Sequence, residues 1–294
     1  MNQLLQLIFN GIVSGAIIAI GAAGVSLVWG VLRIGNFAHG DYMALGAFAA
    51  YVMNGMLGLD LATSTAVAIV VVAVFSVVVD KLALRPMRSK GLTSVFIVTV
   101  GVSFVVRNLL FIVFGSGSHT YRIDQSTVYI VGPLRIAPGQ AITVVVTAVA
   151  IAALGWLLAF TTIGRSMRAV AENSDLAAVT GVNTDRLATV TWLISGSLAG
   201  LAGVCLGLVQ GTFDPNMGAY ILFLLFTSVV LGGIGSAYGA LGGGLVLGLA
   251  MEVSTWSGFG GGLDPRYKVV LAFVVLILML LVRPQGIFGK ARLI

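Results

Sequence analysis

The chain has 294 residues, of which 59% are hydrophobic and only 9% are charged, and it carries a formal net charge of +6. Soluble globular proteins carry about 25% charged residues, so this composition excludes a soluble fold of this size. The excess of Lys and Arg, which in a soluble protein would suggest nucleic acid, is explained by the positive bias of cytoplasmic loops in membrane proteins, and no nucleic-acid partner is expected.

Apolar segments follow one another along the whole chain. They lie at 4–31, 38–55, 61–79, 92–114, 140–160, 187–210, 219–234, 237–254 and 267–282. A bilayer-spanning helix needs about 20 apolar residues, and these segments lack the alternation of barrel strands. We therefore expect an all-α, polytopic bundle of eight or nine spans in the lipid bilayer, forming a single domain over 1–294. No basic residue precedes the first segment, so a cleaved signal peptide is not expected.

The stretch RIGNFAHGDY, after the first apolar segment, is unusually polar. It contains Arg33, Asn36, His39 and Asp41. Placing Arg or Asp at the centre of a span costs roughly 2.5–3.5 kcal/mol each. Either Arg33 lies among headgroups in an interfacial turn, or it pairs with Asp41 beside a polar cavity. Both a structural link between two helices and a role at a translocation path are compatible with this pattern.

Two interrupted segments resemble each other weakly: 30–50 and 232–251 both have a Gly-rich break, an aromatic residue and a small-residue helix. In transporters built from two repeats, paired interrupted segments indicate the central site. The candidate path or gate residues are therefore Asn36, His39, Asp41, Gly232 and Gly233. Elsewhere, glycines at four-residue steps, such as Gly196 and Gly200, are typical of helices that pack closely.

The polar connections predict the orientation. Ten of the sixteen Lys and Arg residues lie in 80–91, in 161–186 and in the C-terminal tail at Arg283, Lys290 and Arg292, whereas the external loop 115–139 has only two. The positive-inside rule places the three basic regions in the cytoplasm and 115–139 outside. The N-terminus is then outside with nine spans and inside with eight. STVYIV, within 115–139, predicts a short hairpin.

Residues within the later apolar segments suggest an ion pair, because Arg107 could meet either Glu252 or Asp214 near the outer side. Signals for an enzyme are missing: the sequence has no HExxH pair, no phosphate-binding loop and a single cysteine, Cys205. No catalytic or metal site and no cofactor are expected in this chain. If transport uses ATP, another polypeptide must hydrolyse it.

The longest polar cytoplasmic segment is 163–187. Within it, SMRAVAENSDLAAVTG predicts a short amphipathic helix with an apolar stripe at Met167, Val170 and Ala171, then Ala177 or Ala178. Gly181 is a suitable stop, and Asn183 or Thr184 can cap the next helix. A helix lying on lipid would fit the amphipathic pattern. Its mixed charges and small residues favour docking on a protein instead.

Four motifs together indicate a family. GRSMRAVAENSDLAAVTGVN resembles the cytoplasmic coupling segment of permease subunits from ABC importers of the branched-chain amino acid type. NFAHGDYMALGAF, VVLGGIGSAYGALGGGLVLG and LVRPQGIFG are similar to other signatures of that family, in the same order. The positions that match the coupling segment are Arg165, Arg168, Glu172, Asn173, Ala177 and Gly181.

The resemblance implies a mechanism. A heterodimer with a related permease subunit would form a path through the bacterial inner membrane, a periplasmic binding protein would deliver the amino acid, and two cytoplasmic ATPase subunits would bind ATP and Mg. Urea or short amides are alternative cargoes of the same architecture. An ion-coupled secondary transporter is a further alternative, but it would leave 163–187 without a role. A channel is less compatible, because no selectivity element is evident.

Overall fold

The computed structural model describes residues 2–123, 127–259, 262–283 and 285–288. The described part is an all-α bundle with one small hairpin, as predicted. Its helices are α1 (Asn2–Leu32), α2 (His39–Tyr51), α3 (Leu61–Val79), α4 (Leu92–Phe114), α5 (Pro138–Phe160), α6 (Thr162–Glu172), α7 (Ser174–Val179), α8 (Thr184–Gln210), α9 (Met217–Gly232), α10 (Ala237–Val253) and α11 (Lys268–Val282). Short helical turns are η1 (Val52–Met56), η2 (Asp80–Leu84), η3 (Arg85–Lys90), η4 (Ser257–Phe259) and η5 (Pro265–Tyr267), and the strands are β1 (Tyr129–Val131) and β2 (Leu134–Ile136). Lys290 and Arg292, expected in a cytoplasmic tail, lie outside the described residues.

Long apolar helices dominate the described residues. Six are long and apolar enough to cross a membrane, and the bent pair α9–α10 makes a seventh if it acts as one span. The expected eight or nine spans are therefore not confirmed by length and composition alone. The difference arises because α2, α9 and α10 have only 13, 16 and 17 residues.

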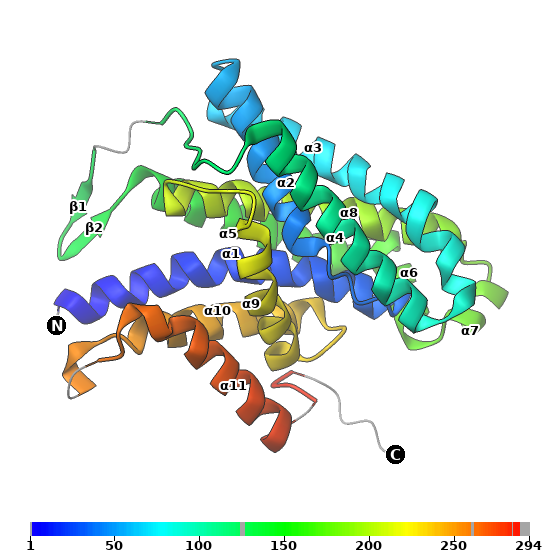
Figure 1. The fold of residues 1–294 in the computed structure, drawn as a ribbon. Coiled ribbons are helices and arrows are strands. Elements are labelled where there is room, and N and C mark those ends of the chain that lie inside the picture. Colours follow the sequence, from blue (N-terminus) through cyan, green and yellow to red (C-terminus); the bar gives the residue numbers. More distant parts are fainter. Residues whose placement is uncertain (1, 124–126, 260–261, 284, 289–294) are drawn as a thin grey trace.

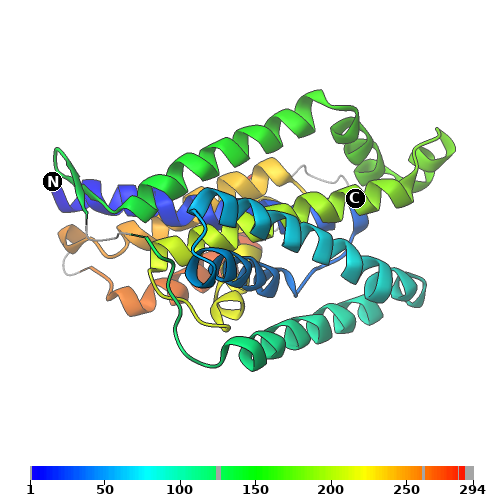
Figure 2. The same ribbon diagram turned by 90° about the horizontal axis from the view of Figure 1, so that it is seen from above.

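Helices α1 and α8 form the buried centre of the bundle. Their most apolar windows are 89% and 78% buried, against 28% for α4, 22% for α5 and 6% for α11. Figure 2 shows α4 and α5 at opposite edges of the bundle, with α1 between them. The outer helices therefore present most of the apolar surface that lipid or another membrane subunit can cover.

Small residues allow α10 to lie along α1. Gly15 of α1 faces Leu245, where an added Cβ would stand 3.0 Å from the Cα atom of Leu245, and Gly248 of α10 touches the backbone of Gly15 in return. On α8, Gly196 packs against Ala73 of α3 in the same way. Because these glycines have no side chains, the helices approach each other closely and gain packing contacts along their length.

The two ends of the bundle are distinct, as Figure 1 shows: the N-terminus and the hairpin β1–β2 lie at one end, and α6 and α7 at the other. The segment 33–56, which contains α2 and η1, connects these ends. Just before α2, Arg33 contacts the carbonyl of Ala171 in α6, whereas in η1 the side-chain oxygen of Asn54 accepts a hydrogen bond from the amide of Arg122, 2.7 Å away in 115–139.

The hairpin confirms one sequence prediction. β1 and β2 pair antiparallel, with Tyr129 opposite Ile136 and Val131 opposite Leu134, and Gly132 has a positive φ of 60° in the turn. The segment that contains this hairpin, 115–139, is fixed to the bundle by a bridge between His119 and Phe213, whose backbone groups exchange two hydrogen bonds.

Several helices begin with a side-chain cap, which satisfies amide groups that have no partner inside the helix. The hydroxyl and the amide of Thr63 donate to the carboxylate of Asp60 before α3, and this lowers the pKa of Asp60. Asn183 accepts from the amide of Arg186 at the start of α8, so the predicted cap at Asn183 or Thr184 is confirmed at Asn183.

Two short helices meet inside the bundle. After α1, the chain turns back over 33–38, and His39 at the start of α2 lies against Gly24, about two helical turns before the end of α1. After α8, the segment 211–216 leads into α9. The backbones of α2 and α9 touch at Gly40 and Gly218, each the second residue of its helix.

The packing of the helices relates a different pair of interrupted segments. α1 packs on α8 and α10, whereas α8 packs on α1 and α3, so the order α1–α2–α3 matches α8–α9–α10 in its packing. By this packing, 33–51 corresponds to 211–232. The resemblance of 30–50 to 232–251 stays a prediction from the sequence.

The contact between Gly40 and Gly218 can be tested by adding one methyl group. In Gly40→Ala, the Cβ atom would collide with the backbone carbonyl of Gly218, which has no flexible side chain that can move away. Overpacking of this kind costs about 1–3 kcal/mol, so we expect a lower melting temperature of the detergent-solubilised protein. Gly101→Ala in α4 is the control, because nothing lies within 4 Å of its added Cβ. Equal melting temperatures for the two variants would contradict the close approach.

Candidate functional site

The break between α1 and α2 has a defined local structure. α1 ends at Leu32, and Arg33 follows with φ of 58°; among the described residues it is the one non-glycine residue with positive φ. For an L-residue this conformation costs about 1–2 kcal/mol. The side chain of Asn36 then accepts a hydrogen bond from the amide of Ala38 at 3.1 Å, which turns the chain into α2. An asparagine supports such a turn through its short side chain.

A buried ion pair holds α2 against α4. Asp41 is completely buried, and its carboxylate accepts hydrogen bonds from Arg107 at 3.0 and 3.1 Å and from the hydroxyl of Ser103. Fork-shaped pairing of a guanidinium with a carboxylate is among the strongest charge-assisted arrangements. The suggested pair of Arg33 with Asp41 is therefore wrong. Arg33 instead donates to the carbonyl of Ala171 at 2.7 Å, because its left-handed backbone directs it toward α6.

The two other partners suggested for Arg107 are also wrong. Glu252, at the end of α10, accepts from the ammonium group of Lys268 at 2.7 Å. Asp214 accepts from the amide of Asn216 at 2.6 Å, within the turn before α9. Glu252 therefore pairs with the first residue of α11, and Asp214 stabilises the turn in which it lies.

The other candidate path residues occupy two different places. Asn36 and His39 are fully buried, like Asp41, and these three line neither of the cavities described below. Gly232 and Gly233 form the tight turn between α9 and α10, where Gly232 packs against Gly239 and Gly233 against Gly286. The structure thus groups Asn36, His39 and Asp41 in one buried region. A role in translocation stays a prediction for all five positions.

The amphipathic helix predicted within 163–187 is two helices. Asn173 interrupts it with an extended backbone, φ −153° and ψ 108°, and its side chain accepts from the amides of Asp175 and Leu176. An asparagine competes in this way with the helical hydrogen bonds of the main chain. Gly181, with φ of 92°, follows α7, as the predicted stop requires.

Several predicted coupling residues shape the segment. Arg168 donates to the carbonyl of Leu158 in α5, and Ala177 is buried. The predicted apolar stripe is buried at Met167, Val170 and Ala177, while Ala171 is half-buried and Ala178 exposed. Arg165, Glu172 and Asn173 are exposed. The segment is therefore held against the bundle by one face and leaves charged groups free on the other.

Two exposed apolar residues were missed by the sequence analysis. Leu176 is 63% exposed and Val179 is 86% exposed, on the short helix α7 at the far end of the bundle. Their spacing of three residues places them on one helical face. The sequence does show two large apolar residues three positions apart, but the alanines between them already complete the predicted apolar stripe.

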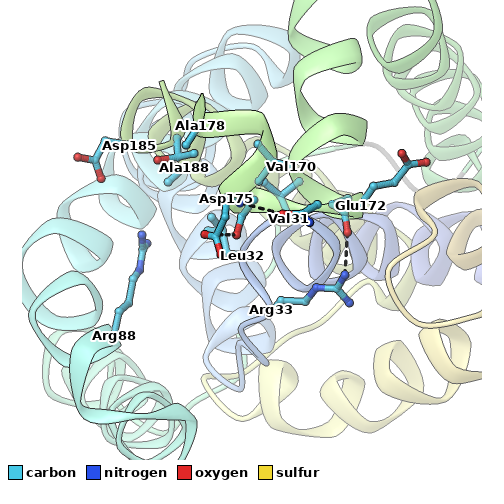
Figure 3. Close-up of a pocket in the computed structure, with 14 residues that line it drawn as sticks. Val31, Leu32, Arg33, Arg88, Val170, Glu172, Asp175, Ala178, Asp185 and Ala188 are labelled. Atoms are coloured by element: carbon cyan, nitrogen blue, oxygen red, sulfur yellow. Dashed lines mark hydrogen bonds between the residues drawn. The ribbon is translucent and has the colours of Figure 1, made fainter. Parts of the chain in front are cut away.

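A cavity of about 470 Å³ lies between this segment and the bundle. It is bordered by the end of α1, by η3, by α6 and α7 and by the start of α8 (Figure 3). Arg33 reaches across it to the carbonyl of Ala171, while the side chain of Glu172 points away from the cavity. Nearby, Arg85 pairs with Asp185 at 2.6 Å, and Arg88 pairs with Asp80. These contacts join the segment to α1 and the start of α8 to η3.

Known proteins resemble this chain over nearly its full length. The sequence model of the family described as "Branched-chain amino acid transport system / permease component" matches residues 7–280. The high-affinity branched-chain amino acid transport system permease protein LivH of Escherichia coli (strain K12) is 33% identical, over 97% of this chain and 96% of LivH. The permease protein BraD of Pseudomonas aeruginosa is 31% identical over the same shares.

One solved structure is similar in fold. PsaBC from Streptococcus pneumoniae, in complex with Fab, superposes with a TM-score of 0.52 at 16% sequence identity. The alignment covers 94% of this chain and 91% of that chain. At this identity the likeness concerns the fold alone, and it supports the helical bundle described above.

Asp41→Asn and Arg107→Gln test the buried ion pair. Each breaks a pair whose carboxylate has no exposed surface and whose guanidinium is 19% exposed, so we expect a loss of about 3–5 kcal/mol in the free energy of unfolding. The double variant should lose less than the two single losses combined, because neither charge is then left alone. The control is Asp185→Asn, which breaks an exposed pair and should change stability little. Reversible unfolding in detergent gives the free energy of unfolding of all four variants. A loss for Asp41→Asn as small as that for Asp185→Asn would contradict the pairing.

Proposed function

The chain belongs to the permease family of branched-chain amino acid transport systems, and from this premise we propose how it works within an ATP-driven importer. As a permease subunit it is a multi-pass membrane protein and not an enzyme. In our proposal it forms a heterodimer with a related permease, and the two subunits enclose the translocation path. Two cytoplasmic ATPase subunits bind ATP and Mg, and a periplasmic binding protein delivers the amino acid. Nothing in the names of the relatives favours urea or short amides.

The proposed topology has nine crossings, with the N-terminus outside and the C-terminus in the cytoplasm of a bacterial inner membrane. Two observations support it. The basic residues of 80–91 and 161–186 lie at the same end of the bundle as α7, since Arg85 pairs with Asp185. α2, α9 and α10 are short, but the segment 33–56 as a whole joins the two ends, and α10 runs back along α1 from Gly30, which touches Gly235, to Gly11, which touches Leu249.

The observation that carries the proposal is the exposed apolar pair on α7. Leu176 and Val179 project from a segment whose other face is packed against the bundle. Exposed apolar side chains on a segment that also exposes charged groups, such as Arg165 and Glu172, are typical of a protein interface rather than of a freely solvated surface. We assign this face to the ATPase subunit, with Leu176 and Val179 as the central contacts and the charged residues around them.

The same geometry supplies a route for movement. Arg168 ties α6 to the end of α5, and Arg33 ties the last turn of α6 to the break between α1 and α2. When the ATPase subunits close, displacement of α6 and α7 is transmitted to 33–38. The buried region around His39 and Asp41 then acts as the fixed part against which Arg33 and the start of the break move.

A crosslinking experiment tests the location of α7. In a Cys205→Ala background, a cysteine at Val179 should react with a short crosslinker to capture the ATPase subunit, because the side chain is 86% exposed at the cytoplasmic end. A cysteine at Ile130, which is exposed in the hairpin at the other end, is the control and should not. Membrane-impermeant maleimide added to intact spheroplasts should label the Ile130 position alone. Labelling of the Val179 position from outside would overturn the orientation.

The contacts themselves can be removed. Changing Leu176→Ser and Val179→Ser together should lower ATP-driven leucine uptake by about tenfold or more, since central apolar contacts are worth at least about 1.4 kcal/mol in an interface. Protein level in the membrane should be unchanged. Ile163→Ser, on the exposed side of α6, is the matched control and should keep most of the uptake. Normal coupling in the double variant would refute the docking face.

A further inference from the structure

A second cavity, of about 280 Å³, lies on the other side of Arg33. It is enclosed by the end of α1, the break at 34–37, the start of α4 and the middle of α9. Four aromatic rings line it, from Trp29, Phe37, Phe96 and Phe226. The ring of Phe37 stacks on Phe226 with centroids 4.7 Å apart and meets the edge of Phe96 at 4.8 Å, so these walls are ordered by their own contacts.

Arg33 is the one charged residue that lines this cavity. The hydrogen bond to Ala171 occupies one of its terminal nitrogens, and a guanidinium has five N–H donors. Its positive φ is a strained state that persists only where the surroundings enforce it, and such strain concentrates at functional positions. The cavity therefore combines an apolar, aromatic interior with a fixed cationic rim.

We propose that this cavity binds the substrate amino acid on the cytoplasmic half of the translocation path. The aliphatic side chain lies among the four rings, and the carboxylate pairs with Arg33. Pockets for drug-sized ligands measure about 300–1,000 Å³, so this cavity suits a smaller solute such as one amino acid. This site rests on the proposed function, to which it adds the residues that bind the substrate.

The backbone that borders the cavity argues against a lipid chain as its occupant. Ile34 and Gly35 lie in the non-helical link between α1 and α2 and line the cavity. Irregular backbone at membrane depth is tolerated where it is buried in protein or faces a water-filled space, and not where it faces lipid. A zwitterionic solute enters with water, so the non-helical backbone at 34 and 35 then faces a hydrated space.

The position of Arg33 gives the site a consequence for coupling. The guanidinium touches α6 on one side and borders the cavity on the other. A carboxylate bound at Arg33 uses the donors that the carbonyl of Ala171 leaves free, so both partners act on one guanidinium. Occupancy of the cavity is therefore communicated to the segment that docks the ATPase subunit, and movement of that segment alters the affinity of the cavity.

Cysteine protection tests the site in the complete importer, reconstituted in proteoliposomes with its partner subunits, where uptake of leucine is measured on the same preparation. In a Cys205→Ala background, Phe96→Cys places a thiol in the wall, and Ile97→Cys places one on the next residue of α4, which is 63% exposed and does not line the cavity. The rate of modification by a small thiosulfonate is followed by mass spectrometry of this chain. L-leucine at ten times its Kd should slow the reaction at position 96 about tenfold, and at position 97 not at all. Glycine, without a side chain, should protect neither position.

Leu92→Cys, at the rim of the same cavity, replaces Phe96→Cys if that variant does not fold. Arg33→Gly should abolish protection by leucine while the melting temperature is kept, because glycine adopts the positive φ without strain. Absence of leucine protection in an importer that still takes up leucine with ATP would overturn the site alone. Protection that does not change with leucine in the bilayer and is lost when detergent replaces the lipid would assign the cavity to lipid. Failure of ATP-driven uptake by the unmodified importer would instead overturn the proposed function.

Discussion

The pairing of Asp41 with Arg107 fixes the rest of this structure. A carboxylate with no exposed surface carries a large desolvation cost, which is offset when a guanidinium and a hydroxyl surround it. Because Arg107 and Ser103 both belong to α4, this single carboxylate sets the position of α2 on α4. The course of 33–38 follows, since α1 is held by α8 and α10, and α2 is held by α8, α3 and α9 as well as by its ion pair to α4. The break is thus a defined element of structure between two fixed helices.

Close backbone contacts complete what the ion pair begins. Gly40 and Gly218 allow α2 and α9 to touch at their first turns, and Gly24 makes room for His39. Two oppositely placed short helices therefore start within the bundle, as in transporters that use interrupted helices at their central site. The break leaves Arg33 between two cavities, one beside the cytoplasmic segment and one among aromatic rings. The proposed coupling depends on an α2 helix that is fixed by its contacts and on an Arg33 side chain that can move between the two cavities.

Sequence patterns predicted the elements well where a local rule applies. The apolar runs 92–114 and 187–210 match α4 and α8 within three residues, and the hairpin and the cap at Asn183 were predicted from turn and capping chemistry. Pairing between distant residues was not predictable. The partner of Arg107 depends on which face of α2 meets α4, and periodicity does not give that. Likewise, the left-handed conformation of Arg33 is invisible in the sequence, because it is imposed by packing on a residue that normally avoids it.

Hydrogen exchange of the amides at the break tests most directly whether the buried ion pair fixes it. The amide of Ala38 donates to the side chain of Asn36, that of His39 to the carbonyl of Asn36, and that of Tyr42 to the carbonyl of Ala38. We predict that these three amides exchange in the folded protein as slowly as those in the middle of α1, and much faster once Asp41 is changed to Asn. Exchange in the unmodified protein as fast as in the loop residues 116–118 would contradict a fixed break.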